Sequence, residues 1–184
     1  MKTRRFLSVL FLLSCIVTVM LAIPGHAVTD PARVQIDSTS AASLRGLIQR
    51  SDAIAIGTIG SQIRSYPTGR TIREGKIVNY TQSFHIRTLI KGRIGSSVTL
   101  ISTGIDPLPG RESPLNQTYP GPLTGGDYLL FLQNVKGTDF YSITGLWQGV
   151  YPIVEGRTVT LEVGFRELHH LSPRQAEQKL RDIR

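Results

Sequence analysis

One stretch of the sequence decides the fold: Val78-Asn79-Tyr80-Thr81-Gln82-Ser83-Phe84-His85-Ile86-Arg87. Four of its five even-numbered positions carry apolar or aromatic side chains, and all five odd-numbered positions are polar. Successive side chains of a strand point to opposite faces, so this pattern predicts a half-buried β-strand. We expect its even-numbered face to share one apolar interior with the continuous apolar run Tyr128–Leu132.

Short runs rich in β-branched residues lie on both sides of this stretch and are separated by turn residues. Residues 53–60 are apolar on both faces, which predicts a strand covered on two sides. Further strands are expected over residues 97–102, 128–132, 139–144, 150–154 and 157–161. Residues 104–127, here named the excursion, are rich in proline and glycine and too polar for a core. Short strands linked by turns predict a mainly β fold, an antiparallel OB-like barrel.

Two helices are expected to flank these strands. The first covers residues 40–50, with Ser40 as its N-cap, and the second covers residues 172–184. Ser172 and Gln175 have the spacing of a capping box around the start of the second helix. The predicted organisation is a signal peptide (1–27), a flexible tether (28–39), a β-barrel domain (40–171) and a C-terminal helix (172–184).

The N-terminus has the features of an export signal. Basic residues at positions 2, 4 and 5 precede an apolar run over residues 6–23, and Gly25-His26-Ala27 offers small residues to a signal peptidase. We therefore expect cleavage after Ala27 and a secreted or extracytoplasmic product. The alternative is an N-terminal membrane anchor, because an uncleaved run of this length is near the lower limit for a spanning helix.

Cysteine and charge narrow the chemistry further. Cys15 is the only cysteine and lies in the signal segment, so the exported product is free of disulfides and thiolates. Residues 28–184 hold 18 Lys and Arg against 13 Asp and Glu, a net charge of +5. The excess is confined to residues 28–100, which hold ten basic and four acidic side chains. This asymmetry favours either simple solubility or an anionic partner.

Basic and aromatic residues supply the candidate ligand-binding positions. They are Arg64, His85, Arg87, Lys91, Arg93 and Trp147. Charge and stacking together suit an anionic cell-surface polymer or a lipid surface. The competing hypothesis is an unknown protein partner that is met through the excursion. We do not expect nucleic acid as a partner, and we expect membrane contact only through the N-terminal segment.

The motifs of common enzyme classes are absent from the sequence. It holds no Gly-x-Ser-x-Gly elbow, no phosphate-binding Gly-rich loop before Lys-Ser/Thr, and no His-Glu-x-x-His. His169 and His170 are adjacent, so their side chains diverge and do not suit one metal ion. We therefore predict a non-enzymatic interaction module without cofactor or metal. A hydrolase built on the scattered carboxylates is the weaker alternative.

Four blocks carry a resemblance to known proteins. They are Arg50-Ser51-Asp52-Ala53-Ile54-Ala55-Ile56-Gly57-Thr58-Ile59, Leu89-Ile90-Lys91-Gly92, Gly125-Gly126-Asp127-Tyr128-Leu129-Leu130-Phe131-Leu132 and Gly145-Leu146-Trp147-Gln148-Gly149-Val150-Tyr151. Their order and spacing resemble a broad group of uncharacterised exported bacterial cell-surface proteins. The layout is also distantly similar to the netrin-like module of tissue inhibitors of metalloproteinases, which implies an OB-type barrel. Those inhibitors act through an N-terminal cysteine, so the resemblance implies the fold and not the inhibition.

Overall fold

The structure is a computed structural model of the chain and describes residues 29–183. The expected signal peptide, its cleavage site after Ala27 and the single cysteine, Cys15, lie outside the described residues. Residues 29–183 contain no cysteine and therefore no disulfide. Among them, no helix combines the length and the apolar character needed to cross a bilayer.

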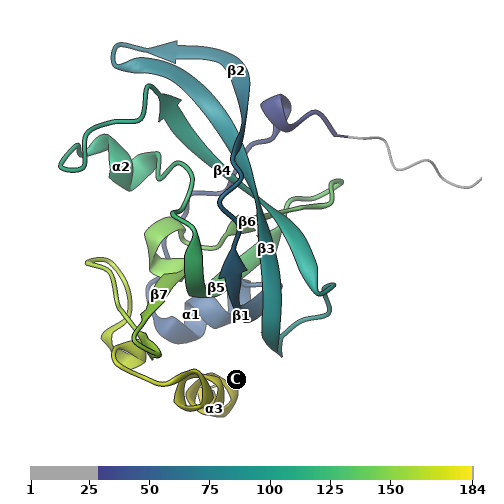
Figure 1. Ribbon diagram of the computed structural model, residues 1–184, viewed down its shortest axis with the longest axis vertical. Helices are drawn as coiled ribbons and strands as arrows, with labels where there is room; N and C mark the ends of the chain where they lie inside the picture. Colours follow the sequence, from purple (N-terminus) through teal and green to yellow (C-terminus); the bar gives the residue numbers. More distant parts are fainter. Residues whose placement is uncertain (1–28, 184) are drawn as a thin grey trace, which may run out of the picture.

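The fold is mainly β, as the sequence predicted, with one helix ahead of the strands and another behind them (Figure 1). Over the described residues the strands are β1 (Ala53–Ile59), β2 (Arg64–Ile72), β3 (Gly75–Lys91), β4 (Ser97–Asp106), β5 (Gly126–Asn134), β6 (Phe140–Ile143), β7 (Val150–Val154) and β8 (Arg157–Thr158). The α-helices are α1 (Leu44–Arg50), α2 (Leu115–Thr118) and α3 (Pro173–Ile183). Short 3₁₀ helices are η1 (Pro31–Arg33), η2 (Leu146–Gly149) and η3 (Arg166–Leu168).

Helix boundaries follow from the caps. α1 begins at Leu44 and not at residue 40, because Ser43 is the N-cap: its backbone is extended and its Oγ accepts a hydrogen bond from the Gly46 amide at 3.1 Å. The capping box of α3 is confirmed. The Ser172 amide donates to Gln175 Oε1 at 2.9 Å, and the Gln175 amide donates to Ser172 Oγ at 3.3 Å.

Several strands differ in length from the prediction, β3 and β8 among them, and β2 was not predicted. β4 and β5 also extend into the two ends of the expected 104–127 excursion. β3 runs for 17 residues because it has two successive neighbours on one edge, β2 along its first half and β1 along its second. β8 holds only two residues of the expected 157–161 strand. Its Thr158 side chain donates to the Leu168 carbonyl, and its amide donates to the Leu171 carbonyl at 2.9 Å, so the chain turns toward the C-terminal segment.

Five strands form a closed ring of pairings. The order is β1-β3-β4-β6-β5, and β5 returns to pair with β1 over seven residue pairs from Ala53↔Leu132 to Ile59↔Gly126. β2 is added to the edge of β3, and β7 and β8 continue from β5. The expectation of an entirely antiparallel sheet is wrong at one pairing, since β4 and β6 are parallel at Thr99↔Phe140 and Leu100↔Tyr141. Antiparallel pairing reverses direction at every step, so a ring with an odd number of strands must contain a parallel pair.

All five ring strands contribute side chains to one apolar interior. Its buried members include Ala53, Ala55 and Ile59 of β1, Phe84 of β3, Leu100 of β4 and Tyr128, Leu130 and Leu132 of β5. Tyr141 and Ile143 of β6 pack against this cluster. Phe84 and Ile86 therefore share one interior with Tyr128, Leu130 and Leu132, which confirms the expected common core for this half of the stretch. Val78 and Tyr80 are buried but belong to neither apolar cluster.

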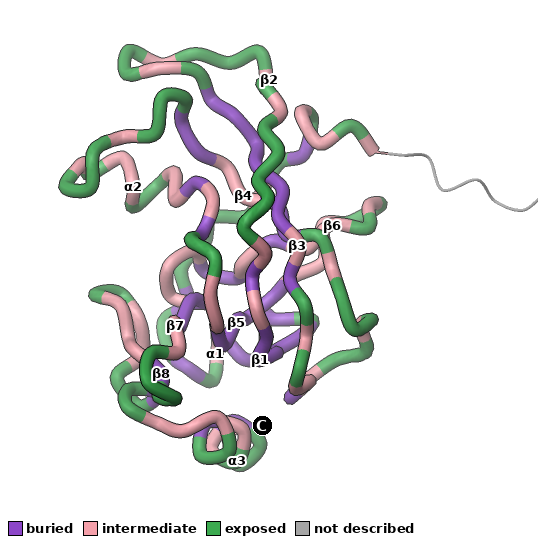
Figure 2. Tube along the Cα trace, viewed as in Figure 1, coloured by how far each residue is buried: buried purple, intermediate pink, exposed green. Residues whose placement is uncertain are grey.

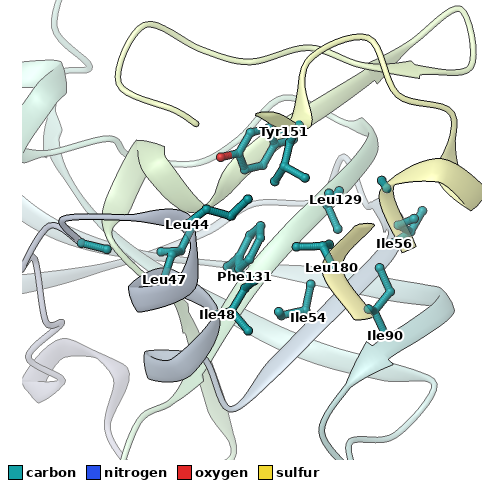
Figure 3. Close-up of a cluster of buried hydrophobic side chains, with 13 residues drawn as sticks. Leu44, Leu47, Ile48, Ile54, Ile56, Ile90, Leu129, Phe131, Tyr151 and Leu180 are labelled. Atoms are coloured by element: carbon teal, nitrogen blue, oxygen red, sulfur yellow. The ribbon is translucent and has the colours of Figure 1, made fainter. Parts of the chain in front are cut away.

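The other face of β1 and β5 is covered by helices. Ile54, Ile56, Leu129 and Phe131 pack there against α1, α3 and Tyr151 (Figure 3). The Phe131 and Tyr151 ring centroids lie 5.8 Å apart. The central parts of β1 and β5 are thus buried on both faces and purple in Figure 2, and residues 53–60 are apolar on both faces for this reason.

Candidate functional site

One cavity of the described residues lies where β4 runs beyond its short pairing with β6. β4 pairs with β6 only at Thr99 and Leu100, so residues 101–106 continue past that contact. A cavity of about 510 Å³ occupies this region. Four parts of the chain form its walls: residues 32–38, the strands β2, β3 and β4, the excursion from Thr118 to Leu123, and the segment from Ile143 to Val150.

The first wall is an extended segment, residues 29–39, which we name the strap. It is the purple stretch of Figure 1 that leads from η1 to α1. Val34 is buried and Ile36 is half-buried, whereas their neighbours Arg33, Gln35 and Asp37 are exposed. This alternation is that of a strand with one covered face, and both apolar side chains line the cavity.

Hydrogen bonds attach the strap to the domain along its length. Asn79 Nδ2 donates to the Pro31 carbonyl at 2.8 Å and to the Val34 carbonyl at 2.9 Å. At the far end, Arg50 Nη2 lies 3.1 Å from Asp37 Oδ2. The pKa of Asp37 is lowered, first by hydrogen bonds from Thr39 and then by Arg50. The segment that the sequence suggested as a tether therefore makes specific contacts with β3 and α1.

The excursion forms another wall, and the side-chain amide of Gln82 on β3 attaches it. Gln82 Nε2 donates to the Leu123 carbonyl at 2.7 Å, and the Leu123 amide donates to Gln82 Oε1 at 2.8 Å. Nearer its middle, the Gly121 amide donates to the Thr103 carbonyl at 3.1 Å. Gln82 thus completes a reciprocal pair with main-chain groups, which explains a polar side chain on the inward face of the strand.

The charged side chains that line this cavity are all positive. Arg33 and Arg70 line it, and its lining contains neither Asp nor Glu. Arg33 Nε lies 3.6 Å from Asp30 Oδ2, with 86% of the Arg33 side chain exposed, so that ion pair is weak. Arg70 takes part in none of the ion pairs found among residues 29–183. A negative group near Arg70 would therefore meet attraction, and no lining side chain would oppose it.

The six residues singled out by the sequence lie elsewhere, and none lines this cavity. Arg64 is exposed on β2, opposite Thr81 of β3. His85 is exposed on β3, and Arg93 is exposed in the turn after it. Trp147 is half-buried beside the ring interior, where its Nε1 donates to the Asn116 carbonyl at 2.6 Å and supports the excursion.

Arg87 is held in an ion pair. Its Nη2 lies 2.8 Å from Asp127 Oδ2, while the Thr58 hydroxyl donates to Asp127 Oδ1 at 2.6 Å. The Thr58 hydrogen bond is the main cause that lowers the pKa of Asp127, and Arg87 adds to it. The guanidinium of Arg87 is thus already balanced by a carboxylate.

Lys91 is bound to the end of a helix. Its Nζ donates to the Ile48 carbonyl at 2.6 Å and to the Ser51 carbonyl at 2.5 Å, at the C-terminus of α1. The last carbonyls of a helix lack partners within the helix and carry partial negative charge, so an ammonium group is well suited there. The arrangement gives Lys91 a structural role at α1.

Metal-ligating side chains do not gather in the described part of the chain. No group of three or more His, Cys, Asp or Glu among residues 29–183 is arranged to hold a metal ion. The His169 and His170 rings have centroids 4.4 Å apart, and His169 Nδ1 accepts a hydrogen bond from the Thr160 amide at 3.2 Å.

The residues that sequence reasoning missed are those that hold the cavity walls. Asn79 and Gln82 were part of the decisive stretch, yet their partners lie 45 and 41 positions away. The alternation of Val34 and Ile36 with polar neighbours was a signal that could have been found. Neither a protein-family model nor a curated protein sequence matches this chain.

Proposed function

We propose that this protein is an exported, non-catalytic binding module whose ligand occupies the cavity between the strap and the excursion. The observation that carries the proposal is the cavity itself, about 510 Å³ in volume and walled by four segments that are far apart in the sequence. This volume lies within the roughly 300–1,000 Å³ of small-molecule sites. Export to the cell exterior rests on the sequence of residues 1–27.

The ring of strands supports the more specific proposal of an OB-like barrel. Its members in chain order are β1, β3, β4, β5 and β6, and its pairing order places β6 between β4 and β5 with a parallel β4–β6 contact. An OB-type barrel has five strands, and its ligands lie against the second and third of them and the adjoining loops. The corresponding strands here are β3 and β4, which contribute Ile77, Asn79 and Ile101 to the cavity.

The two partner hypotheses of the sequence can be weighed against these contacts. An anionic polymer or lipid surface bound through Arg64, Arg87, Lys91 and Arg93 is the weaker proposal, because two of the four already have partners within the domain. A protein met through the excursion would have to share it with the cavity, since Leu123 and Gly121 line the cavity wall. The cavity is therefore the site that we put first.

The test is saturable binding of a neutral apolar fluorophore, N-phenyl-1-naphthylamine, to the purified protein. Ala32 lines the cavity from the strap, so Ala32→Trp should fill it and abolish the fluorescence increase. Thr39→Trp places the same side chain at an exposed strap position outside the cavity lining and should leave binding unchanged. Thermal unfolding verifies that both variants fold. Equal binding by all three proteins, or no saturable binding by the unsubstituted protein, would contradict the proposal.

A further inference from the structure

We infer that the cavity takes a single-chain amphiphile with an anionic head group, its apolar chain between strap and sheet and its head at Arg70. This inference rests on the proposed function and specifies the ligand class of the same site. It follows from three features of the cavity: the character of its floor, the sign of its charges and its size.

Five apolar residues with little exposed surface line the cavity and form what we call its floor. Val34, Ile77, Ile101, Leu123 and Val150 all line it, and each has at most 9% of its surface exposed. They come from five different parts of the fold and converge on one space. The polar Asn79 beside them has both amide hydrogens engaged with strap carbonyls, so it offers no free donor to a polar ligand body. A hydrocarbon chain suits these surroundings.

The charged side chains of the lining are both cationic. Arg70 projects from β2 and is exposed, and Arg33 stands on the strap. A guanidinium presents a planar fork of donors that matches carboxylate and phosphate oxygens. The lining offers no carboxylate that would attract a cationic head or repel an anionic one. The sign of the charge therefore selects an anionic head group.

The size of the cavity limits the ligand to a small molecule. About 510 Å³ accommodates one chain with a compact head and not a folded partner. Free fatty acids and single-chain phospholipids share this chemistry, and we commit to the shared feature, one chain with one anionic head.

The first experiment measures chain-length dependence with saturated carboxylates of eight, ten and twelve carbons that compete with N-phenyl-1-naphthylamine below their micelle-forming concentrations. Each methylene buried should tighten binding about fourfold until the cavity is full. Affinity that does not change with chain length would overturn the inference. Lyso-phosphatidylglycerol of matched chain length, run in parallel, tells whether a carboxylate or a phosphodiester head binds better.

The second experiment tests the charge with a matched pair of variants. Arg70→Gln should weaken dodecanoate binding about tenfold, the loss expected for hydrogen bonds to a charged group. Arg73→Gln removes the same charge from the same hairpin, at a side chain that is 95% exposed and outside the cavity lining, and should have little effect. Dodecyltrimethylammonium should bind the unsubstituted protein more weakly than dodecanoate does. Equal losses in the two variants, or equal binding of the two amphiphiles, would overturn the inference.

The outcomes separate this inference from the proposed function. If Ala32→Trp abolishes binding of both amphiphiles while Arg70→Gln changes nothing, the cavity is a binding site and the anionic class is wrong. If dodecanoate binds equally well to Ala32→Trp, both proposals fail. Anionic phospholipid vesicles provide the last comparison: binding to vesicles that Ala32→Trp leaves intact, without any binding of monomeric dodecanoate, would identify a membrane surface as the ligand and overturn the inference.

Discussion

Asn79 holds Val34 across 45 positions of sequence, its Nδ2 donating to the Val34 carbonyl at 2.9 Å. Three residues further along β3, Gln82 holds Leu123 in a reciprocal pair of hydrogen bonds. Val34 and Leu123 both line the cavity, Val34 from the strap and Leu123 from the excursion. One strand therefore fixes both the strap and the excursion through side-chain amides, and the shape of the cavity depends on these two residues.

Replacing Asn79 by leucine should release the strap. The carbonyl oxygens of Pro31 and Val34 would each lose a donor, and the side chain is 1% exposed, so water does not readily replace it. We expect a loss of about 1–3 kcal/mol in the free energy of unfolding, measured by urea denaturation. Faster amide hydrogen exchange over residues 31–36 should accompany it.

Thr103→Val is the matched control for that experiment. The Thr103 hydroxyl donates to Asn79 Oδ1 at 2.7 Å, so valine removes one bond from the same amide and leaves both strap bonds in place. In the Thr103→Val variant, amide hydrogens of the strap should exchange at the same rate as in the unsubstituted protein. If Asn79→Leu also leaves strap exchange unchanged, the amide does not anchor the strap.

The alternation over residues 78–87 correctly predicted that Phe84 points into the core. It did not predict that polar residues of the other face are buried as well. Phe84 lies in the ring interior as expected, and His85 is exposed. Asn79 and Thr81, expected on a polar outer face, are buried. Alternation indicates only on which face of the strand a side chain lies. It does not show that the strap, from a distant part of the chain, covers Asn79.

The candidate site residues were predicted because they are basic or aromatic. The groups that they bind within the domain could not be predicted from the sequence. Lys91 lies next to a turn and resembles any exposed lysine, yet its carbonyl partners are 40 and 43 positions earlier. Arg87 and Asp127 are also far apart in sequence and meet only because β1 pairs with both β3 and β5. The ring closure that creates these contacts is a property of the whole sheet.

Lys91→Met should destabilise the protein without any ligand present. It removes an ammonium group from the carbonyls at the end of α1 and retains a side chain of similar length. We expect a loss of about 1–2 kcal/mol in urea denaturation. Arg93→Met, two residues away at an exposed position, should change stability by less than about 0.5 kcal/mol. Equal effects of the two substitutions would refute a structural role that is particular to Lys91.

The ionisation of Asp127 should depend on both Thr58 and Arg87. Both neighbours lower the pKa of this carboxyl group: the Thr58 hydrogen bond is the largest single cause, and Arg87 contributes both a hydrogen bond and its charge. A lowered pKa in the folded state adds stability above the ordinary carboxyl range, and that stability is lost as the pH falls through the lowered value. In carboxyl-carbon NMR titrations, Thr58→Val and Arg87→Gln should therefore each raise the Asp127 pKa. An unchanged pKa in Thr58→Val would show that the hydroxyl does not stabilise the carboxylate.

Gly104 of β4 is the place where the later part of the excursion, at Gly121, packs closely against the strand. A Cβ atom at this position would lie 2.7 Å from the Tyr80 ring and 2.8 Å from Gly121 Cα, and real contacts of Cβ atoms are longer. Tyr80 is itself buried and its hydroxyl donates to the Ile105 carbonyl at 3.3 Å, so the ring has little room to move. Gly104→Ala must then displace the backbone at Gly121, which forms part of the cavity wall.

We expect Gly104→Ala to cost about 1–3 kcal/mol in urea denaturation, as overpacked sites do, and to weaken binding of N-phenyl-1-naphthylamine. Gly110→Ala is the matched control, because it adds the same methyl group to the same excursion at a position with nothing within 4 Å. Alanine there should be neutral or slightly stabilising, since it restricts the unfolded chain without a contact to disturb. If both alanines were tolerated equally, the excursion would not press on β4 at Gly104, and the cavity wall between Gly121 and Leu123 would have to lie further from the strand.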